Sequence, residues 1–211
     1  MSRERDEAIS EQIIGVVLEL LESDGYDAVQ LREVAKRAHM SLATVYKHFA
    51  TRDALLVAAV RRWMEINTYA AVTPPAASET LYDGVMRLLT YVFEPWEDHP
   101  KMLEAYYRTR RGAGGESLDT QGVIAIMPIA IPLFKGADPR YAEDVGVVLA
   151  NMSYALIGRF VDKNIEITEI LPTLERAVFR LTSDNAATAE AARSGVETHE
   201  IDPNYSSPFN H

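Results

Sequence analysis

The sequence contains no cysteine, which excludes disulfide bonds, thiolate metal sites and a cysteine nucleophile. It also lacks a long hydrophobic run, because its most apolar segment, residues 122–134, is shorter than the roughly 20 residues that a membrane span needs. The first ten residues, MSRERDEAIS, are charged and lack the apolar stretch of a signal peptide. These absences predict a cytoplasmic protein with no membrane partner.

Catalytic signatures are missing as well. No G-x-S-x-G motif, no Gly-rich phosphate loop and no H-E-x-x-H motif occurs in the sequence. The histidines are scattered without metal-ligand spacing, and they are His39, His48, His99, His199 and His211. We therefore expect no enzyme, no metal site and no cofactor.

Charge is unevenly distributed along the 211 residues, which carry a net charge of −10. Residues 30–62 hold seven basic side chains against two acidic ones, so this window carries +5 and the remainder carries −15. The charged residues of the window are Arg32, Glu33, Lys36, Arg37, Lys47, Arg52, Asp53, Arg61 and Arg62. Phosphate binding depends on lysine and arginine, so a local basic surface on an acidic body fits DNA contact at one end of the molecule.

Apolar residues recur with helical spacing along most of the chain. One stripe predicts a helix over about residues 6–24 that ends at Gly25, and it consists of Ile9, Ile13, Val16, Val17 and Leu20. Shorter stripes predict helices over 31–38, after Ser41 and after Thr51, with both hydroxyl residues as N-caps. Three short helices with one tight turn make a helix-turn-helix unit, and the fourth helix is long enough to leave it.

Residues 25–56, GYDAVQLREVAKRAHMSLATVYKHFATRDALL, resemble the DNA-binding domain of the TetR/AcrR family of transcriptional regulators. The family pattern has a glycine and an aromatic residue after the first helix, then xxxVAxxA, and then SxxTxYxHFxxKxxLL. Met40 and Arg52 stand where valine and lysine are commoner. The resemblance covers about residues 7–60. It implies an all-α fold in which a helix-turn-helix domain is joined by a long helix to a helical ligand-binding and dimerisation domain.

The helix after Ser41 is the expected DNA-reading helix. Its small N-terminal residues can enter the roughly 12 Å wide major groove, where Thr44 can hydrogen-bond a base edge, although a purely structural role for Thr44 stays open. The flank of this helix, the starts of its neighbours, and Arg3 and Arg5 as a flexible arm are expected to contact the DNA around it. The predicted DNA-contacting residues are Gln30, Arg32, Ser41, Leu42, Ala43, Thr44, Tyr46, Lys47, His48, Thr51 and Arg52.

The segment TPPAAS at residues 73–78 interrupts the helical pattern, because its two prolines cannot continue a helix. We place the domain boundary before it, within the fourth helix. This predicts a DNA-binding domain over residues 1–62, an effector-binding and dimerisation domain over 63–184, and a loosely ordered tail over 185–211.

The second domain is predicted to hold a ligand cavity. Pro128 and Pro132 should kink or break a helix within an apolar run, and the irregular backbone would leave space beside it. Aromatic and methionine side chains suit a small hydrophobic or aromatic effector, although most of them can equally be core residues. The candidate pocket residues are Met86, Tyr91, Phe93, Trp96, Tyr106, Tyr107, Met127 and Tyr154, with Arg108 and Asn151 as polar anchors.

Two further apolar stripes, over residues 145–160 and 170–181, predict the last two helices. In the family that the chain resembles, these helices pair with their copies, which implies a homodimer on a palindromic double-stranded DNA operator. The runs NMSYALIGRFVDKN and LERAVFRL also resemble KstR-like regulators of sterol or lipid breakdown in actinobacteria. The expected function is a repressor released by a small apolar effector. The alternative is a helical protein-interaction module that does not bind DNA.

Overall fold

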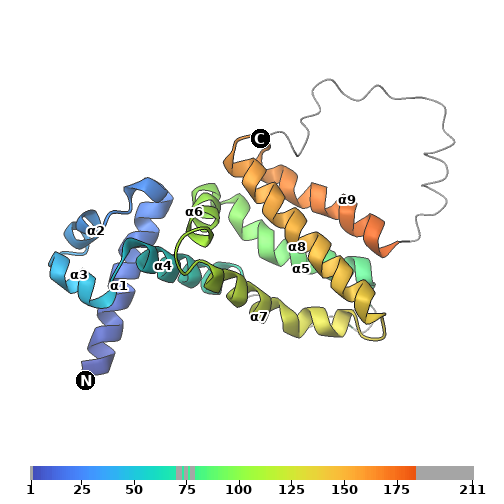
Figure 1. Cartoon of the computed structure of the whole chain (residues 1–211), viewed down its shortest axis with the longest axis horizontal. Helices are drawn as coiled ribbons and strands as arrows, with labels where there is room; N and C mark the ends of the chain where they lie inside the picture. Colours follow the sequence, from blue (N-terminus) through green and yellow to red (C-terminus); the bar gives the residue numbers. More distant parts are fainter. Residues whose placement is uncertain (1, 70–72, 74–75, 77–78, 184–211) are drawn as a thin grey trace.

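The computed structural model of the chain describes residues 2–69, 73, 76 and 79–183. Within these residues every regular element is a helix, and an N-terminal head over residues 2–52 is joined to a bundle of helices over residues 81–182 (Figure 1). This arrangement confirms the predicted all-α fold with an N-terminal helix-turn-helix unit. The tail predicted over residues 185–211 and most of the TPPAAS segment lie outside the described residues.

Helix α1 (Ser2–Ser23) begins four residues earlier than its apolar stripe predicts. The stripe itself is confirmed, since Ile13, Val17 and Leu20 are fully buried. Gly25 ends the helix with a φ of +84°, a conformation that side chains with a Cβ rarely adopt, and its amide donates to the carbonyl of Leu20 at 3.0 Å. The predicted flexible arm is wrong, because residues 3 and 5 belong to the helix.

A 3₁₀ turn, η1 (Tyr26–Ala28), leads into α2 (Leu31–Arg37) and α3 (Leu42–His48). Ser41 caps α3 as predicted, because its Oγ accepts the backbone N–H of Thr44 at 3.0 Å. His39, in the connection between the two helices, has a φ of +53° and turns the chain sharply. The buried side chains of α2 and α3 pack against α1, so the opposite face of α3 is left to solvent.

Helix α4 (Arg52–Asn67) connects the head to the bundle. Thr51 caps it as predicted by accepting the N–H of Ala54 at 3.0 Å. Its apolar face is fully buried and consists of Leu55, Leu56, Ala59, Val60, Trp63 and Met64. Because α4 packs against α1 on one side and against α6 and α7 on the other, it lies in both parts of the molecule (Figure 1).

The bundle begins with α5 (Leu81–Glu97) and α6 (Pro100–Arg110). Thr80 caps α5 by accepting the N–H of Asp83 at 3.1 Å, and Pro100 occupies the first turn of α6, where its missing N–H is not needed. Helix α6 packs against α1, η1 and α4 as well as against α5, α7 and α8. It is therefore the element of the bundle that contacts the head most widely.

Helix α7 (Glu116–Leu133) runs through both prolines of the apolar segment. The predicted break at Pro128 and Pro132 is wrong, because the segment remains helical on both sides of them. A proline removes only its own N–H from the ladder, and exposed carbonyls of the preceding turn can reach water instead. Both proline side chains are exposed, so no neighbouring helix is displaced by their rings.

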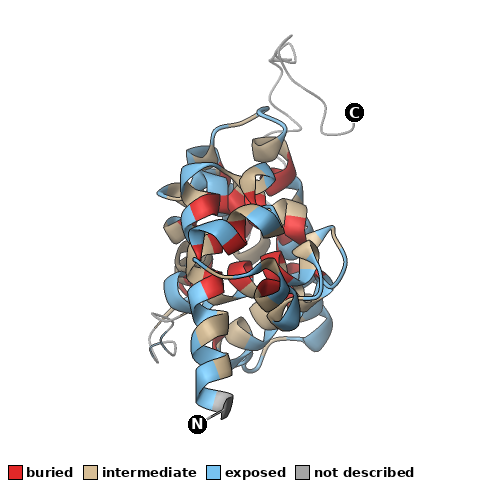
Figure 2. Cartoon of the chain, turned by 90° about the vertical axis from the view of Figure 1, so that its left-hand side faces the viewer, coloured by how far each residue is buried: buried red, intermediate tan, exposed pale blue. Residues whose placement is uncertain are grey.

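The last helices are α8 (Pro139–Val161) and α9 (Ile170–Thr182), separated by the 3₁₀ turn η2 (Ile167–Glu169). Helix α9 packs against both α5 and α8 through Ile170, Leu174 and Val178, and buried residues concentrate on such inner faces (Figure 2). Among the described residues, α8 alone is long and apolar enough to cross a membrane, a test that a core helix of a soluble protein also passes.

Candidate nucleic-acid interface and ligand cavity

Helix α3 presents one face to solvent, on the side of the head away from the bundle. Val45 is buried and Phe49 is partly buried against the core, which confirms the predicted inner face. Ser41, Ala43, Tyr46 and Lys47 are exposed, while Leu42 and Thr44 are half-buried. An exposed helix face of this size, with small residues in its first turn, can enter a major groove.

The first turn of α3 holds its hydroxyl groups in a fixed arrangement. The Oγ of Ser41 and the Oγ1 of Thr44 lie 2.8 Å apart and share one hydrogen bond. A hydroxyl has one donor and two acceptor sites, so Thr44 keeps hydrogen-bonding capacity for a base edge while Ser41 holds its rotamer. The arrangement is compatible with both roles that the sequence leaves open for Thr44.

The second turn of α3 carries an aromatic and a basic side chain. Tyr46 is 50% exposed, an unusual amount for a large side chain on a short helix. The Nζ of Lys47 lies 3.2 Å from the Oδ1 of Asp6 in α1, and both side chains are exposed. Such a pair contributes little in water, so Lys47 can exchange Asp6 for a phosphate at small cost.

The starts of α2 and α4 flank this face. Gln30 is the N-cap residue of α2 and Thr51 is that of α4, and both are exposed. Arg32 is exposed in the first turn of α2. The Nε2 of Gln30 donates to the carbonyl of Asp27 at 3.2 Å. Free backbone N–H groups at helix starts favour anions, so these positions suit phosphate groups on either side of a groove.

His48 does not belong to the exposed face, which corrects the sequence prediction. Its Nδ1 lies 2.9 Å from the Oγ of Ser10 in α1, and its Nε2 is buried without a hydrogen-bond partner among the described residues. The imidazole therefore joins α3 to α1 instead of facing outwards. A phosphate cannot reach either ring nitrogen while this packing holds.

Arg52 is the second correction to the predicted interface. Its Nε donates to the carbonyl of Val29 at 2.5 Å, and its Nη2 donates to the carbonyl of Tyr26 at 2.7 Å. The guanidinium also lies 4.4 Å from the centre of the Tyr26 ring. Arg52 thus joins the start of α4 to η1, and its Nε and Nη2 are directed into the head.

Part of the basic window is neutralised by acids from outside it. Arg37 contacts Asp24 at 2.9 Å, Arg62 contacts Glu11 at 3.4 Å, and Lys47 contacts Asp6. These acids come from α1 and its end, and a count over residues 30–62 omits them. The charge of +5 for the window therefore overstates the positive charge available to DNA.

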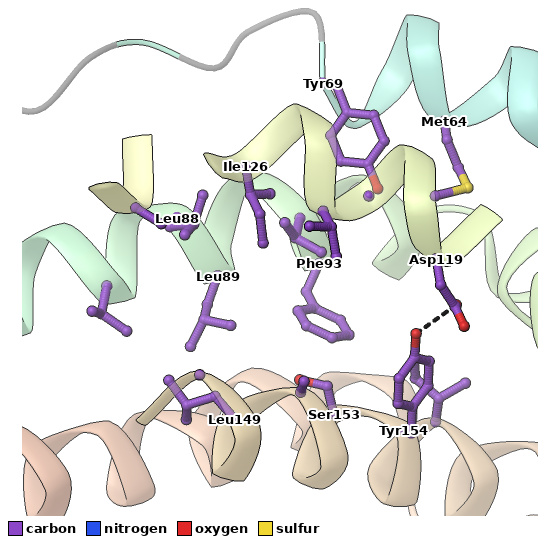
Figure 3. Close-up of a pocket in the computed structure, with 18 of the residues that line it drawn as sticks. Met64, Tyr69, Leu88, Leu89, Phe93, Asp119, Ile126, Leu149, Ser153 and Tyr154 are labelled. Atoms are coloured by element: carbon purple, nitrogen blue, oxygen red, sulfur yellow. Dashed lines mark hydrogen bonds between the residues drawn. The ribbon is translucent and has the colours of Figure 1, made fainter. Parts of the chain in front are cut away.

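The bundle forms a partly open cavity of about 260 Å³ between α5, α7 and α8, with α4 and α6 at one end (Figure 3). Most of its wall is aliphatic or aromatic. The lining residues are Met64, Tyr69, Val85, Leu88, Leu89, Val92, Phe93, Trp96, Leu103, Tyr106, Leu118, Asp119, Gly122, Val123, Ile126, Ala130, Phe134, Val145, Gly146, Leu149, Ala150, Ser153, Tyr154 and Ile157. An apolar cavity with few polar groups is typical of a small-molecule site.

One end of the cavity is polar. The Oδ1 of Asp119 accepts hydrogen bonds from the hydroxyl of Tyr154 and from the Nε of Arg110, each at 2.6 Å. The guanidinium of Arg110 lies 3.6 Å from the centre of the Tyr154 ring, and Arg110 is not among the residues that line the cavity. Burial raises the pKa of Tyr106 and of Tyr154 above their ordinary range, so both phenols keep their protons.

Four of the predicted pocket residues line this cavity: Phe93, Trp96, Tyr106 and Tyr154. The structure places the others elsewhere. Tyr91 hydrogen-bonds Thr73, Asn151 donates to the carbonyl of Val147 on its own helix, and Met127 faces outwards. Met86 and Tyr107 are partly buried against the core outside the lining, and Arg108 pairs with Asp27. Helical spacing predicts an apolar face but does not say which part of it borders empty space.

Two residues of the polar end, Tyr69 and Asp119, were absent from the sequence prediction. Asp119 is the last charged residue before the uncharged run of 120–134, and this isolated acid next to an apolar run was the available signal. Tyr69 follows the end of α4, where no periodic pattern marks it. Its position depends on Gly122, because a Cβ there would lie 3.1 Å from the hydroxyl of Tyr69.

Contacts of α6 connect the cavity with the head. Arg108 donates two hydrogen bonds to Asp27 of η1, at 2.7 and 2.9 Å, and lies 4.0 Å from the centre of the Tyr26 ring. Tyr26 therefore stacks with Arg108 of the bundle and also with Arg52 of the head. Two further contacts join α6 to the end of α1: His99 with Glu22 at 2.7 Å, and Lys101 with the carbonyl of Ser23 at 2.6 Å.

Comparison with known proteins agrees with this geometry. Residues 13–59 match the sequence model of the bacterial regulatory proteins of the tetR family, and residues 78–181 match that of the tetracyclin repressor-like C-terminal domain. The chain belongs to the TetR family of transcriptional regulators.

Two transcriptional regulators have sequences similar to part of this chain. An uncharacterised HTH-type transcriptional regulator in the dhlA 5′ region of Xanthobacter autotrophicus is 36% identical over 87 residues, 40% of this chain and 43% of the relative. The HTH-type transcriptional repressor KstR of Rhodococcus jostii is 30% identical over 97 residues, 46% of this chain and 45% of the relative. The chain thus spans less than half the length of these two relatives. The predicted resemblance to KstR-like regulators is confirmed at the level of sequence.

A solved structure shows the same fold over most of the chain. The crystal structure of a TetR transcriptional regulator from Rhodococcus sp. RHA1 superposes with a TM-score of 0.64 at 21% identity. The superposition covers 85% of this chain and 98% of that one. The head and the bundle therefore have the arrangement of a TetR regulator.

Proposed function

We propose that the chain is a repressor that binds a palindromic DNA operator as a homodimer and leaves it when a small apolar effector fills the cavity. The observation that carries the proposal is the position of α6. Its Tyr106 lines the cavity, and its Arg108, two residues further along, contacts Tyr26 and Asp27 of the head. One helix thus contacts both a ligand site and a DNA-reading unit.

The proposed DNA contacts divide into two groups. Base edges are read from the first turn of α3, by Leu42, Ala43 and Thr44, with Ser41 holding Thr44 in place. Phosphates are bound by the exposed groups around that turn, which are Gln30, Arg32, Tyr46, Lys47 and Thr51. His48 and Arg52 are left out of this set because their ring nitrogens and donors contact the head itself.

The proposed dimer uses the last two helices. Helix α8 leaves Val147 and Val148 about half exposed, and α9 leaves Phe179 52% exposed, so each carries apolar surface that its own subunit does not cover. Two heads related by twofold symmetry would place their reading helices one DNA turn apart, about 34–36 Å. The dimer would thereby read both halves of a palindrome.

The proposed response to effector is a change in head position. When a ligand occupies the cavity, its contacts with Tyr106 and with Asp119, which accepts the Nε of Arg110, shift α6 relative to the head. Because Arg108 and Lys101 fasten α6 to η1 and to the end of α1, the shift changes the spacing of the two heads. Coupling of this kind typically amounts to about 1–3 kcal/mol, a 5- to 150-fold loss of DNA affinity.

The remaining expectations follow from family membership. TetR regulators act on DNA, so we propose that this chain acts in the cytoplasm and catalyses no reaction. Among the described residues no cluster of acidic and histidine side chains has the geometry of a metal site.

Fluorescence anisotropy on the DNA upstream of the chain's own gene tests the proposal, with a scrambled fragment of the same length as control. We expect specific binding by two subunits per site that weakens steeply with salt. Tyr46→Ala should weaken binding to every fragment, whereas Thr44→Ala should mainly relax the preference for the operator. Normal operator binding by Tyr46→Ala would contradict the assignment of α3. No binding to any fragment at low salt would favour the protein-interaction module.

A further inference from the structure

The polar end of the cavity restricts what the effector can be. Asp119 is the one charged residue that lines the cavity within the described part of the chain. Its Oδ1 is occupied by Tyr154 and Arg110, whereas its Oδ2 accepts no hydrogen bond from any described residue. A carboxylate oxygen without a donor, on a residue that lines an apolar cavity, is a vacant acceptor for a ligand.

A second vacant group lies at the same end. The hydroxyl of Tyr69 has no hydrogen-bond partner among the described residues, and Figure 3 shows it directed towards the end that holds Asp119 and Tyr154. Burial, together with the nearby Tyr154 and Asp119, raises the pKa of Tyr69 above its ordinary range. The phenol therefore keeps its proton and can donate a hydrogen bond.

The positive charge that pairs with Asp119 is screened from the ligand. Arg110 does not line the cavity, because Asp119 accepts its Nε and the Tyr154 ring covers its guanidinium at 3.6 Å. A ligand carboxylate would thus meet the Asp119 carboxylate first, in surroundings where an unpaired charge is costly. A hydrocarbon would fit the walls but would leave Asp119 Oδ2 and the Tyr69 hydroxyl unpaired.

We propose that the cavity binds an uncharged apolar molecule that ends in a hydroxyl group. The ligand hydroxyl donates to the Oδ2 of Asp119 and accepts from the hydroxyl of Tyr69, while its apolar part lies along Leu88, Leu89, Phe93 and Leu149. This inference rests on the proposed effector function and names the ligand class. The cavity of about 260 Å³ holds about nine water-sized groups, so a ligand of roughly that many heavy atoms fits.

The test compares three small molecules with the same eight-carbon chain and different ends: 1-octanol, octanoate and 1-methoxyoctane. Binding is followed at neutral pH by tryptophan fluorescence, because Trp96 lines the cavity. The other tryptophan of the chain, Trp63, lies beside it, with the ring centres 4.2 Å apart. We expect 1-octanol to bind at least tenfold more tightly than octanoate. The ether, which accepts but cannot donate, should bind about tenfold more weakly than the alcohol.

Matched variants assign the effect to the polar end. Tyr69→Phe removes one hydroxyl that bonds no described residue, so it should fold normally and lose several-fold affinity for 1-octanol. Tyr91→Phe, whose hydroxyl contacts Thr73 outside the cavity, is the control and should bind as the native chain does. Asp119→Asn should reduce the discrimination against octanoate.

The outcomes separate this inference from the repressor assignment, because the readout requires no DNA. Equal affinities for the three probes, tighter binding of octanoate, or no binding of 1-octanol would each overturn the hydroxyl-ended ligand class and leave operator binding untouched. Failure of operator binding together with selective 1-octanol binding would instead overturn the repressor function and leave the ligand class standing.

Discussion

Replacing Arg52 by alanine distinguishes a structural role from a phosphate contact. Its two hydrogen bonds reach the carbonyls of Val29 and Tyr26, and its guanidinium stacks on the Tyr26 ring. Hydrogen bonds from a charged donor contribute about 1.5–3 kcal/mol each, and a stacked cation about 0.5–1 kcal/mol at exposed sites. Because the side chain is half-buried, the lower values apply and the expected loss in the free energy of unfolding is about 3.5 kcal/mol.

Urea unfolding and salt-dependent DNA binding measure the two roles separately. At a denaturant slope of about 3 kcal/mol per molar urea, Arg52→Ala should lower the unfolding midpoint by about 1 M. At temperatures where the variant is folded, the dependence of DNA affinity on salt should equal that of the native chain. Arg52→Lys should be destabilised in a similar way, because an ammonium group keeps the charge but not the two-pronged geometry.

Lys47→Ala is the matched control, since Lys47 is exposed on α3 and, within the described part of the chain, forms its ion pair with Asp6. It should leave the urea midpoint unchanged and reduce the salt slope by about 1.8, because a dimer carries two copies and each phosphate contact contributes about 0.9. The structural role of Arg52 is refuted if Arg52→Ala unfolds at the native midpoint while its salt slope falls by the amount expected for Lys47→Ala. Arg52 would then bind phosphate, as the sequence predicts.

Two further predictions concern the head. Ser41→Ala removes the acceptor for the Thr44 N–H and should cost about 1 kcal/mol of stability, measurable by thermal unfolding, whereas an unchanged midpoint would show that α3 does not need this cap. The hydrogen bond from Arg108 holds the pKa of Asp27 below its ordinary value, so its contribution to stability is present above about pH 4 and is lost as pH falls through the lowered pKa. Asp27→Asn should therefore make the free energy of unfolding less dependent on pH below about pH 4. If the native chain and the variant lose stability equally as the pH falls, the Arg108 contact does not contribute.

Much of the fold was predictable because its determinants are local. Ser41 and Thr51 cap their helices as expected, and the apolar stripes of α1 and α4 are buried as expected, since caps and stripes depend on residues within one or two turns. Pro128 and Pro132 are the exception. The low helix propensity of proline predicts a kink or a break, but the α7 helix continues. Carbonyl groups on its exposed side can accept hydrogen bonds from water in place of the missing N–H groups.

The sequence predicts which face of α3 is exposed, but it does not predict the contacts of every residue in the candidate interface. The exposed positions of Tyr46 and Lys47 follow from which residues of α3 face inwards. The contacts that hold His48 and Arg52 within the head were not predictable, because their partners lie 38 and 23 to 26 residues away in the sequence. No pattern over a few turns indicates that Ser10 or the carbonyl of Val29 will take those side chains.

By itself, the sequence determined the order of the helices, their buried faces and the family of the chain, because helical periodicity, capping and a dense motif are read from neighbouring residues. Only the tertiary structure decided which basic side chains remain available to DNA, and that Asp119 and Tyr69 meet at the end of an apolar cavity. It also decided that α6 contacts the head through Arg108. These features arise from the packing of helices far apart in sequence, where a side chain's role depends on the groups that folding places beside it.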